Sequence, residues 1–319
     1  MLSLIVENKG ERIHSMKNVN TPYDDVFRTL LTDGKRLIIP VVNEAFGKNY
    51  TGDEEVRFFQ NEHFLSKQDG EEDSRITDSH FAIIGETKST YHIECQSVAD
   101  GSMILRMFEY DTQIALMDRA YEDNKLIMNF PNSAVLYLRS KKSTPDVMTV
   151  QINLPQNKVA EYEIPILKVR NYGVDEIFEK RLLFLIPFHL FCYAGNLDSI
   201  NQKEEKLTSL LSEYEGIRQR LDRLCEDNKI TEFEKQLIID MTKKVVDNLA
   251  RNQEPIKEGV KEVMGGKVLE YEAKTILKQG IAQGIEQERN KLSNLIQKLL
   301  ILIELFYYIS HIDKHISIY

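Results

Sequence analysis

Two acids and an amide in neighbouring extended segments have the clearest chemical potential in this chain. Asp78 lies in one β-branched segment, and Glu94 and Gln96 lie in the next. Residues two apart in a strand share a face, so Glu94 and Gln96 project from the same side, and Tyr91, Ile93 and Cys95 form the opposite, core-like face. If the segments pair as an antiparallel hairpin, Asp78 lies roughly opposite Gln96 or Ser97, and a shift of one residue in the register would change this.

Two carboxylates placed this closely repel each other unless a cation or a proton lies between them. Hard oxygen ligands of this kind suit Mg²⁺ or Mn²⁺. Such an ion supplies what phosphodiester hydrolysis needs, because it polarises the phosphoryl oxygen and lowers the pKa of the attacking water. The spacing also fits a plain alternative, a solvated hairpin face whose acids have no chemical role, since charged pairs are common on exposed strands.

The elements that must position these residues follow from the hydrophobic pattern. Alternating or β-branched runs predict strands over 55–64, 75–84, 90–98, 133–139, 147–154 and 161–169, with a polar hairpin loop between the second and third. Helical spacing predicts helices over 20–47, interrupted at Gly34 and resumed over 37–46, over 102–120, and over 175–193, the last disturbed near Pro187. Pro22 suits a first helical turn and Gly47 a helix end. Helices and strands that follow one another along the chain in this way predict a mixed α/β domain.

Beyond residue 195 the composition becomes charged and almost entirely helical in pattern. Thr231 and Glu234 match a capping box at one helix start. We therefore expect four parts: a 1–19 N-terminal extension, a 20–195 α/β domain, a 196–296 charged helical extension and a 297–319 apolar tail. The longest apolar run of the tail is shorter than the roughly 20 residues of a membrane span, so we expect no membrane contact.

The bulk composition narrows the function without choosing it. The net charge of −9 argues against a protein that coats nucleic acid through a positive field, but an enzyme can use local arginines and bound metal instead. Three cysteines far apart in the sequence fit a reducing cytosol, so we expect a cytoplasmic protein. Phosphate-loop, dinucleotide-binding and serine-hydrolase motifs do not occur.

The chain resembles a known family along these segments. The strings RITDS at 75–79, YHIECQS at 91–97 and SMILRMFEYD at 102–111 are similar to the core of the PD-(D/E)XK nuclease family transposases. Residues 21–28 resemble the family's opening helix, and residues 178–193 resemble its closing apolar helix. The resemblance covers roughly residues 20–290, and its strongest part is the spacing of an Asp, a Glu and a Gln in an α-β-β-α setting.

The resemblance implies a restriction-endonuclease-like mixed sheet flanked by helices, with a helical C-terminal extension. It implies that Asp78, Glu94 and the backbone carbonyl of Cys95 hold Mg²⁺ or Mn²⁺. Gln96 stands where many members carry Lys, and a neutral amide can orient water or a phosphate oxygen without supplying charge. Asp24 matches an acid of the opening helix that supports the site.

Basic and imidazole side chains near these acids complete the expected site. Phosphate contacts are expected from three arginines, Arg28, Arg75 and Arg106. An ion pair between Arg106 and Glu109 is an equally open alternative. His80 and His92 flank the acids, but histidines in such positions are more often solvated strand residues, and we favour that interpretation.

Two functions from different classes fit these observations. The first is a metal-dependent DNA endonuclease associated with mobile elements or recombination, in which Asp78, Glu94, Gln96 and Asp24 form the catalytic set. The second is a catalytically weak nuclease-fold protein that binds DNA or another protein through its helical C-terminal region. DNA is the expected partner in the first, and the C-terminal helices also allow a homo-oligomer.

Overall fold

The structure is a computed structural model that describes residues 22–59, 62–66, 72–76, 79–98 and 101–265. For 62–66 and 72–76 it describes the strands but not their side chains. The described elements lie in one compact unit that spans Met1–Met264. The predicted extension 1–19, the end of the helical region after 265 and the apolar tail 297–319 lie outside the described residues.

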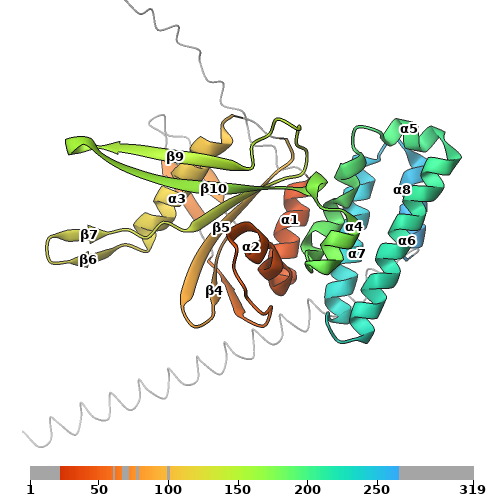
Figure 1. Ribbon diagram of the computed structural model, residues 1–319, viewed down its shortest axis with the longest axis horizontal. Helices are drawn as coiled ribbons and strands as arrows, with labels where there is room; N and C mark the ends of the chain where they lie inside the picture. The colour runs from red at the N-terminus through yellow and green to blue at the C-terminus, as the bar shows by residue number, and fades with distance from the viewer. Residues whose placement is uncertain (1–21, 60–61, 67–71, 77–78, 99–100, 266–319) are drawn as a thin grey trace, which may run out of the picture. The chain divides into compact units, whose positions relative to one another are not determined.

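A six-stranded mixed sheet is the largest sheet in the described chain (Figure 1). In spatial order its strands are β1 (Glu55–Phe58), β4 (His80–Ile84), β5 (Lys88–Gln96), β8 (Asn132–Tyr137), β10 (Lys158–Lys168) and β9 (Val147–Leu154). The central strands β5, β8 and β10 run parallel, and the outer pairs β1–β4, β4–β5 and β10–β9 are antiparallel. The predicted mixed α/β class is confirmed.

Two small ribbons and a set of helices surround this sheet. The ribbons pair β2 (Glu62–Ser66) with β3 (Glu72–Ile76) and β6 (Ala120–Glu122) with β7 (Lys125–Ile127). The helices near the sheet are α1 (Pro22–Asp33), α2 (Ile39–Phe46), α3 (Met103–Met117) and α4 (Val174–Glu179). The 3₁₀ segments are η1 (Lys35–Ile38), η2 (Pro155–Asn157), η3 (Val169–Asn171) and η4 (Leu183–Tyr193), and the later helices are α5 (Leu197–Gln202), α6 (Glu204–Glu226), α7 (Glu232–Leu249) and α8 (Glu254–Val263).

Several elements differ from those that the pattern predicts. The strands expected over 55–64 and 75–84 are each divided, because β2 and β3 leave the large sheet and pair with each other. The helix expected over 175–193 ends at Glu179, where Arg181 adopts a φ of 56° and the chain continues as the 3₁₀ segment η4 around Pro187. Local propensity identifies extended or helical segments but not their pairing partners.

One face of the sheet packs against α1 and joins the main hydrophobic core. The predicted core-facing set of β5 is confirmed, since all three of its members are buried there: Tyr91, Ile93 and Cys95. The apolar stripe of α1 meets them with Val26, Phe27, Leu30 and Leu31. The same core continues into the helical region, with buried residues that include Leu210, Tyr214, Ile238 and Val246.

The opposite face of the sheet lies under α3. Met103 and Met107 pack there against apolar side chains of β8 and β10. Because side chains alternate along a strand, the polar residues of β5 from His92 to Gln96 also face α3. The predicted polar face is therefore covered by a helix rather than left to solvent.

Helices α6, α7 and α8 form a helical layer, in which α7 packs on α1 and η4 of the α/β part (Figure 1). The predicted capping box at the start of α7 is confirmed, since the Thr231 amide donates to Glu234 Oε2 at 2.8 Å and the Glu234 amide donates to Thr231 Oγ1 at 3.1 Å. Among the described residues, no helix combines the length and the apolar character that a membrane crossing requires.

A buried histidine ties η4 to α6. His189 is 3% exposed, and its Nε2 lies 2.8 Å from Oε1 of Glu213. The Tyr193 hydroxyl donates to the same carboxylate at 2.9 Å, and Cys192 Sγ lies 3.9 Å from His189 Nδ1. Burial alone lowers the pKa of His189, but its contacts with Cys192 and Glu213 outweigh burial and raise that pKa to about 9.

This pairing predicts a pH-dependent stability. An unfolded histidine titrates near pH 6.5, so the protonated pair stabilises the fold fully below about pH 6.5 and is lost as the pH rises through about 9. Across this range we expect the free energy of unfolding of the wild type to fall by on the order of 3 kcal/mol more than that of His189→Gln. Urea denaturation at a series of pH values measures both slopes, and parallel curves would contradict the pairing.

Candidate functional site

Glu94 is a half-buried carboxylate at the end of β5 whose two oxygens have different surroundings. Its side chain is 21% exposed. Oε1 accepts a hydrogen bond from the Ser79 hydroxyl at 2.9 Å and lies 3.1 Å from His92 Nε2. Oε2 has no hydrogen-bond partner among the described residues. The protein thus holds one oxygen in place and leaves the other available to a ligand.

Behind Glu94 lies a fully buried acid, Asp111 of α3. Its Oδ1 lies 2.8 Å from His92 Nδ1 and accepts from the Ser133 hydroxyl at 2.6 Å, and its Oδ2 accepts from the Tyr162 hydroxyl at 3.3 Å. The three partners come from the three parallel strands β5, β8 and β10. One carboxylate therefore connects α3 to each central strand.

His92 joins the buried acid to the half-buried one. Burial alone lowers the pKa of His92, but its hydrogen bonds with Asp111 and Glu94 outweigh burial and raise that pKa to about 9. Burial likewise opposes ionisation of Glu94, but hydrogen bonds from His92 and Ser79 and the charge of Arg106 outweigh it and lower the pKa of Glu94. Glu94 is therefore ionised at neutral pH, as a cation ligand must be.

Gln96 shares the face of Glu94 and is held by α3. Arg106 donates from a guanidinium nitrogen to Gln96 Oε1 at 3.0 Å. A cation thus orients the amide group of Gln96. Arg106 thus contacts Gln96, one of the predicted catalytic residues.

The other two arginines expected to contact phosphate lie on different elements. Arg28 is on α1, one turn after Asp24. Arg75 lies in β3, whose side chains are outside the described part of the structure.

Asp24 approaches from α1, on the other face of the sheet. Burial raises the pKa of the Cys95 thiol, and the charges of Asp24 and Glu94 raise it further, so both acids lie near this residue. Cys95 is 8% exposed in the core, a position that argues against a nucleophilic thiol. The neighbouring acid Asp25 instead forms a 3.7 Å ion pair with Lys244 of α7.

Asp78 lies outside the described residues, so its predicted place beside Glu94 and Gln96 stays a prediction. The register of the described hairpin differs from the predicted one. Asp78 opposite Gln96 requires His80 opposite Glu94, whereas β4 and β5 place His80 opposite His92. The register of a hairpin depends on the conformation of the short loop between its strands, and the composition of the loop does not determine that conformation.

The predicted ligand set can be tested on the oxygen atoms that the structure describes. In the described part of the chain, no group of three or more His, Cys, Asp or Glu side chains could hold a metal ion. The predicted set is different, since it combines two carboxylates with a main-chain carbonyl. The Gln96 carbonyl accepts from the Leu138 amide at 3.0 Å, and carbonyls alternate along a strand, so the Cys95 carbonyl faces the β4 side. This carbonyl and Glu94 Oε2 are oxygen donors of the type that a hard divalent cation prefers.

Sequence reasoning missed most of the network around Glu94. Both histidines were expected in solvent, but His92 is fully buried and His80 is 5% exposed, because α3 and the β1 end cover this face. The roles of Ser79, Asp111, Ser133 and Tyr162 were not predicted. One sequence feature could have predicted the burial of Asp111: it lies four residues after Met107, on the same inward-facing side of the helix.

No family model, curated protein or solved structure matches this chain. The resemblance to the nuclease family transposases therefore stays a prediction from the residues quoted above.

The network predicts a large cost for removing Asp111. Asp111→Ala removes the buried acceptor of His92, Ser133 and Tyr162, so we expect a loss of about 3–5 kcal/mol in the free energy of unfolding. Ser133→Ala removes one neutral donor and should cost only about 1 kcal/mol. Asp118→Ala, at the exposed end of α3, is the matched control and should be within about 0.5 kcal/mol of wild type. Chemical denaturation measures all three, and a mild effect of Asp111→Ala would contradict the network.

Proposed function

We propose that this chain is a metal-dependent DNA endonuclease with a restriction-endonuclease-like fold, associated with mobile elements or recombination. The observation that carries the proposal is the state of Glu94. It is an ionised carboxylate with one oxygen held by Ser79 and His92 and the other open, at the end of a central strand. Asp78 directly precedes Ser79 in the sequence, which supports its choice as the second acid.

Each residue has a defined task in this proposal. Asp78, Glu94 and the Cys95 carbonyl would hold Mg²⁺ or Mn²⁺, which when bound polarises the phosphoryl oxygen and lowers the pKa of water. Gln96 orients the attacking water or a phosphate oxygen, and Arg106 holds its amide in position. Arg106 also keeps Glu94 ionised through its charge.

The scaffold behind the site limits the motion of Glu94. His92 cannot rotate freely because its other nitrogen contacts the buried Asp111. His92 is therefore a fixed hydrogen-bond partner of Glu94, the proposed metal ligand, as supporting residues of metal sites commonly are. Asp24 and the arginines Arg28 and Arg75 stay expected contributors from α1 and β3, as support for the site and as phosphate contacts.

The main test is cleavage of supercoiled and linear DNA in the presence of Mg²⁺ or Mn²⁺. We expect nicking or double-strand cleavage by the wild type and none by Asp78→Ala or Glu94→Ala, because each variant removes a carboxylate ligand. Glu161→Ala, which removes an exposed acid of β10, is the charge-matched control and should cut like the wild type.

Calorimetry with Mn²⁺ separates the endonuclease from a protein that only binds. A wild type that binds Mn²⁺ and a Glu94→Ala variant that does not would support the proposed site. Folded protein that binds DNA but neither binds divalent metal nor cuts any substrate form would select the binding function instead.

A double-mutant cycle tests the coupling of Gln96 to Arg106. Gln96→Ala and Arg106→Gln each remove one side of the same hydrogen bond. The loss of transition-state stabilisation in the double variant, from kcat/KM, should therefore be smaller than the sum of the two single losses by on the order of 1 kcal/mol. Arg106→Gln combined with Glu161→Ala is the control pair and should be additive. Additive effects in the first pair would show that Arg106 does not act through Gln96.

A further inference from the structure

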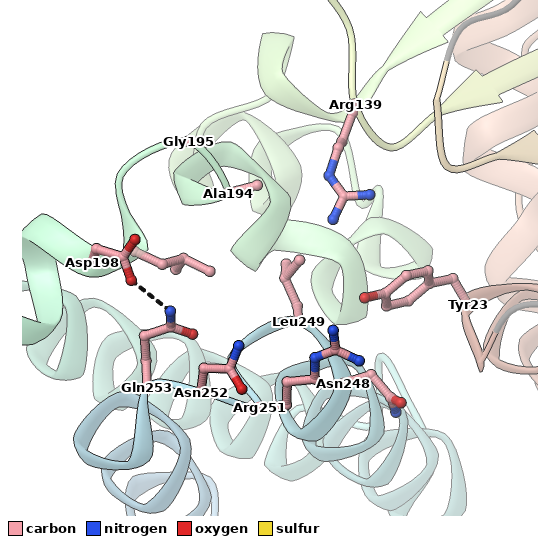
Figure 2. Close-up of a pocket in the computed structure, with 11 residues that line it drawn as sticks. Tyr23, Arg139, Ala194, Gly195, Asp198, Asn248, Leu249, Arg251, Asn252 and Gln253 are labelled. Carbon is pink, nitrogen blue, oxygen red and sulfur yellow. Dashed lines mark hydrogen bonds between the residues drawn. The ribbon is translucent and has the colours of Figure 1, made fainter.

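A polar pocket of about 440 Å³ lies where the helical layer meets the end of the sheet (Figure 2). Its walls come from α1, the turn after β8, the η4–α5 junction and the α7–α8 turn, and its lining residues include Tyr23, Arg139, Asp198, Asn248, Arg251 and Asn252. Figure 2 shows the Tyr23 hydroxyl and the guanidinium groups of Arg139 and Arg251 directed into this space.

The charge of the pocket is opposite to that of the chain. Two arginines line it against a single acid, Asp198, whose Oδ1 accepts a 2.7 Å hydrogen bond from Gln253. Neither Arg139 nor Arg251 forms an ion pair with any described residue. In a protein with a net charge of −9, two such guanidinium groups in one concave site favour an anionic ligand.

A buried aromatic ring positions two of the donors. The Arg139 guanidinium carbon lies 4.8 Å from the ring centroid of Phe191, and the Tyr23 ring meets the same ring edge-on with centroids 4.9 Å apart. Phe191 is 5% exposed in the main core. Arg139 and Tyr23 are therefore both held against Phe191, which reduces the conformational entropy that their side chains lose when a ligand binds.

The pocket adjoins the candidate site along two chain segments. Tyr23 directly precedes Asp24 on α1. On the sheet, the Leu138 amide donates to the Gln96 carbonyl at 3.0 Å and the Arg139 amide donates to the Ser97 carbonyl at 3.2 Å. The segment that carries Arg139 is therefore hydrogen-bonded to the residues at the end of β5, so the pocket and the candidate site lie at the same end of these two strands.

We propose that the Arg139–Arg251 pocket binds a backbone phosphate of the DNA strand that the proposed endonuclease site cuts, an inference that rests on the proposed function. Arginine forks match the two free oxygens of a phosphodiester and can bind them in a bidentate manner. The Tyr23 hydroxyl supplies a neutral donor to the same group. Such contacts fix the position of the strand without reading its sequence.

The test is the salt dependence of DNA binding, measured on the full chain without divalent metal so that no cleavage occurs. For a short fluorescent duplex, Arg139→Gln/Arg251→Gln should weaken binding at least about tenfold and reduce the slope of log K against log salt by about 2. Arg36→Gln/Arg57→Gln is the charge-matched control, because both arginines are exposed and paired with Asp53 and Glu55. The single variant Arg251→Gln, in an exposed turn, should show about half of the slope change without disturbing Phe191.

Equal effects of the two double variants would overturn the proposal, since the pocket would then add nothing beyond general charge. Titration with inorganic phosphate separates the two sources of the ligand. Loss of phosphate binding in Arg139→Gln/Arg251→Gln with unchanged DNA affinity would assign the pocket to free phosphate and overturn the DNA contact.

Failure of the proposed cleavage is distinguishable from failure of this inference. Glu94→Ala should keep the wild-type salt slope, and the double arginine variant should keep its kcat at saturating DNA while its KM rises. Intact DNA binding that depends on the arginines, in a chain that never cuts, would support the phosphate pocket and contradict the endonuclease alone.

Discussion

The burial of the Asp111 charge is the constraint on which the centre of this fold depends. A carboxylate without solvent is costly unless hydrogen bonds and an opposite charge compensate it. Here the compensation comes from His92, Ser133 and Tyr162, one from each of the parallel strands β5, β8 and β10. The same contacts that satisfy the buried acid therefore also attach α3 to the sheet.

His92 links Asp111 to the candidate site because each of its two ring nitrogens contacts a different carboxylate. One contacts Asp111 in the interior and the other contacts Glu94 at the partly exposed end of β5. The protonated ring lowers the pKa of Glu94, and the charge of Arg106, nearer the start of α3, lowers it further. A half-buried acid with a fixed geometry and a low pKa is suited to binding a cation, and the proposed endonuclease uses it in this way.

The chain is acidic overall, yet its polar surfaces are not uniform. The pocket beside the candidate site combines Arg139, which follows a strand of the sheet, with Arg251, which follows a helix of the helical layer. Phe191 of η4 supports the first of these arginines. The helical layer therefore completes a cationic pocket at the end of β8, which the proposed DNA contact uses.

The sequence by itself determined those features that depend on neighbours in the chain. Period-two alternation assigned Ile93 and Cys95 to one face of β5 and Glu94 to the other, and the capping box at Thr231 follows from hydrogen bonds within one helical turn. Tertiary structure decided what covers each face, because helix packing and strand register depend on contacts between distant segments. It buried His92 beneath α3, shifted the β4–β5 register by two residues from the predicted one, and brought Arg139 together with Arg251.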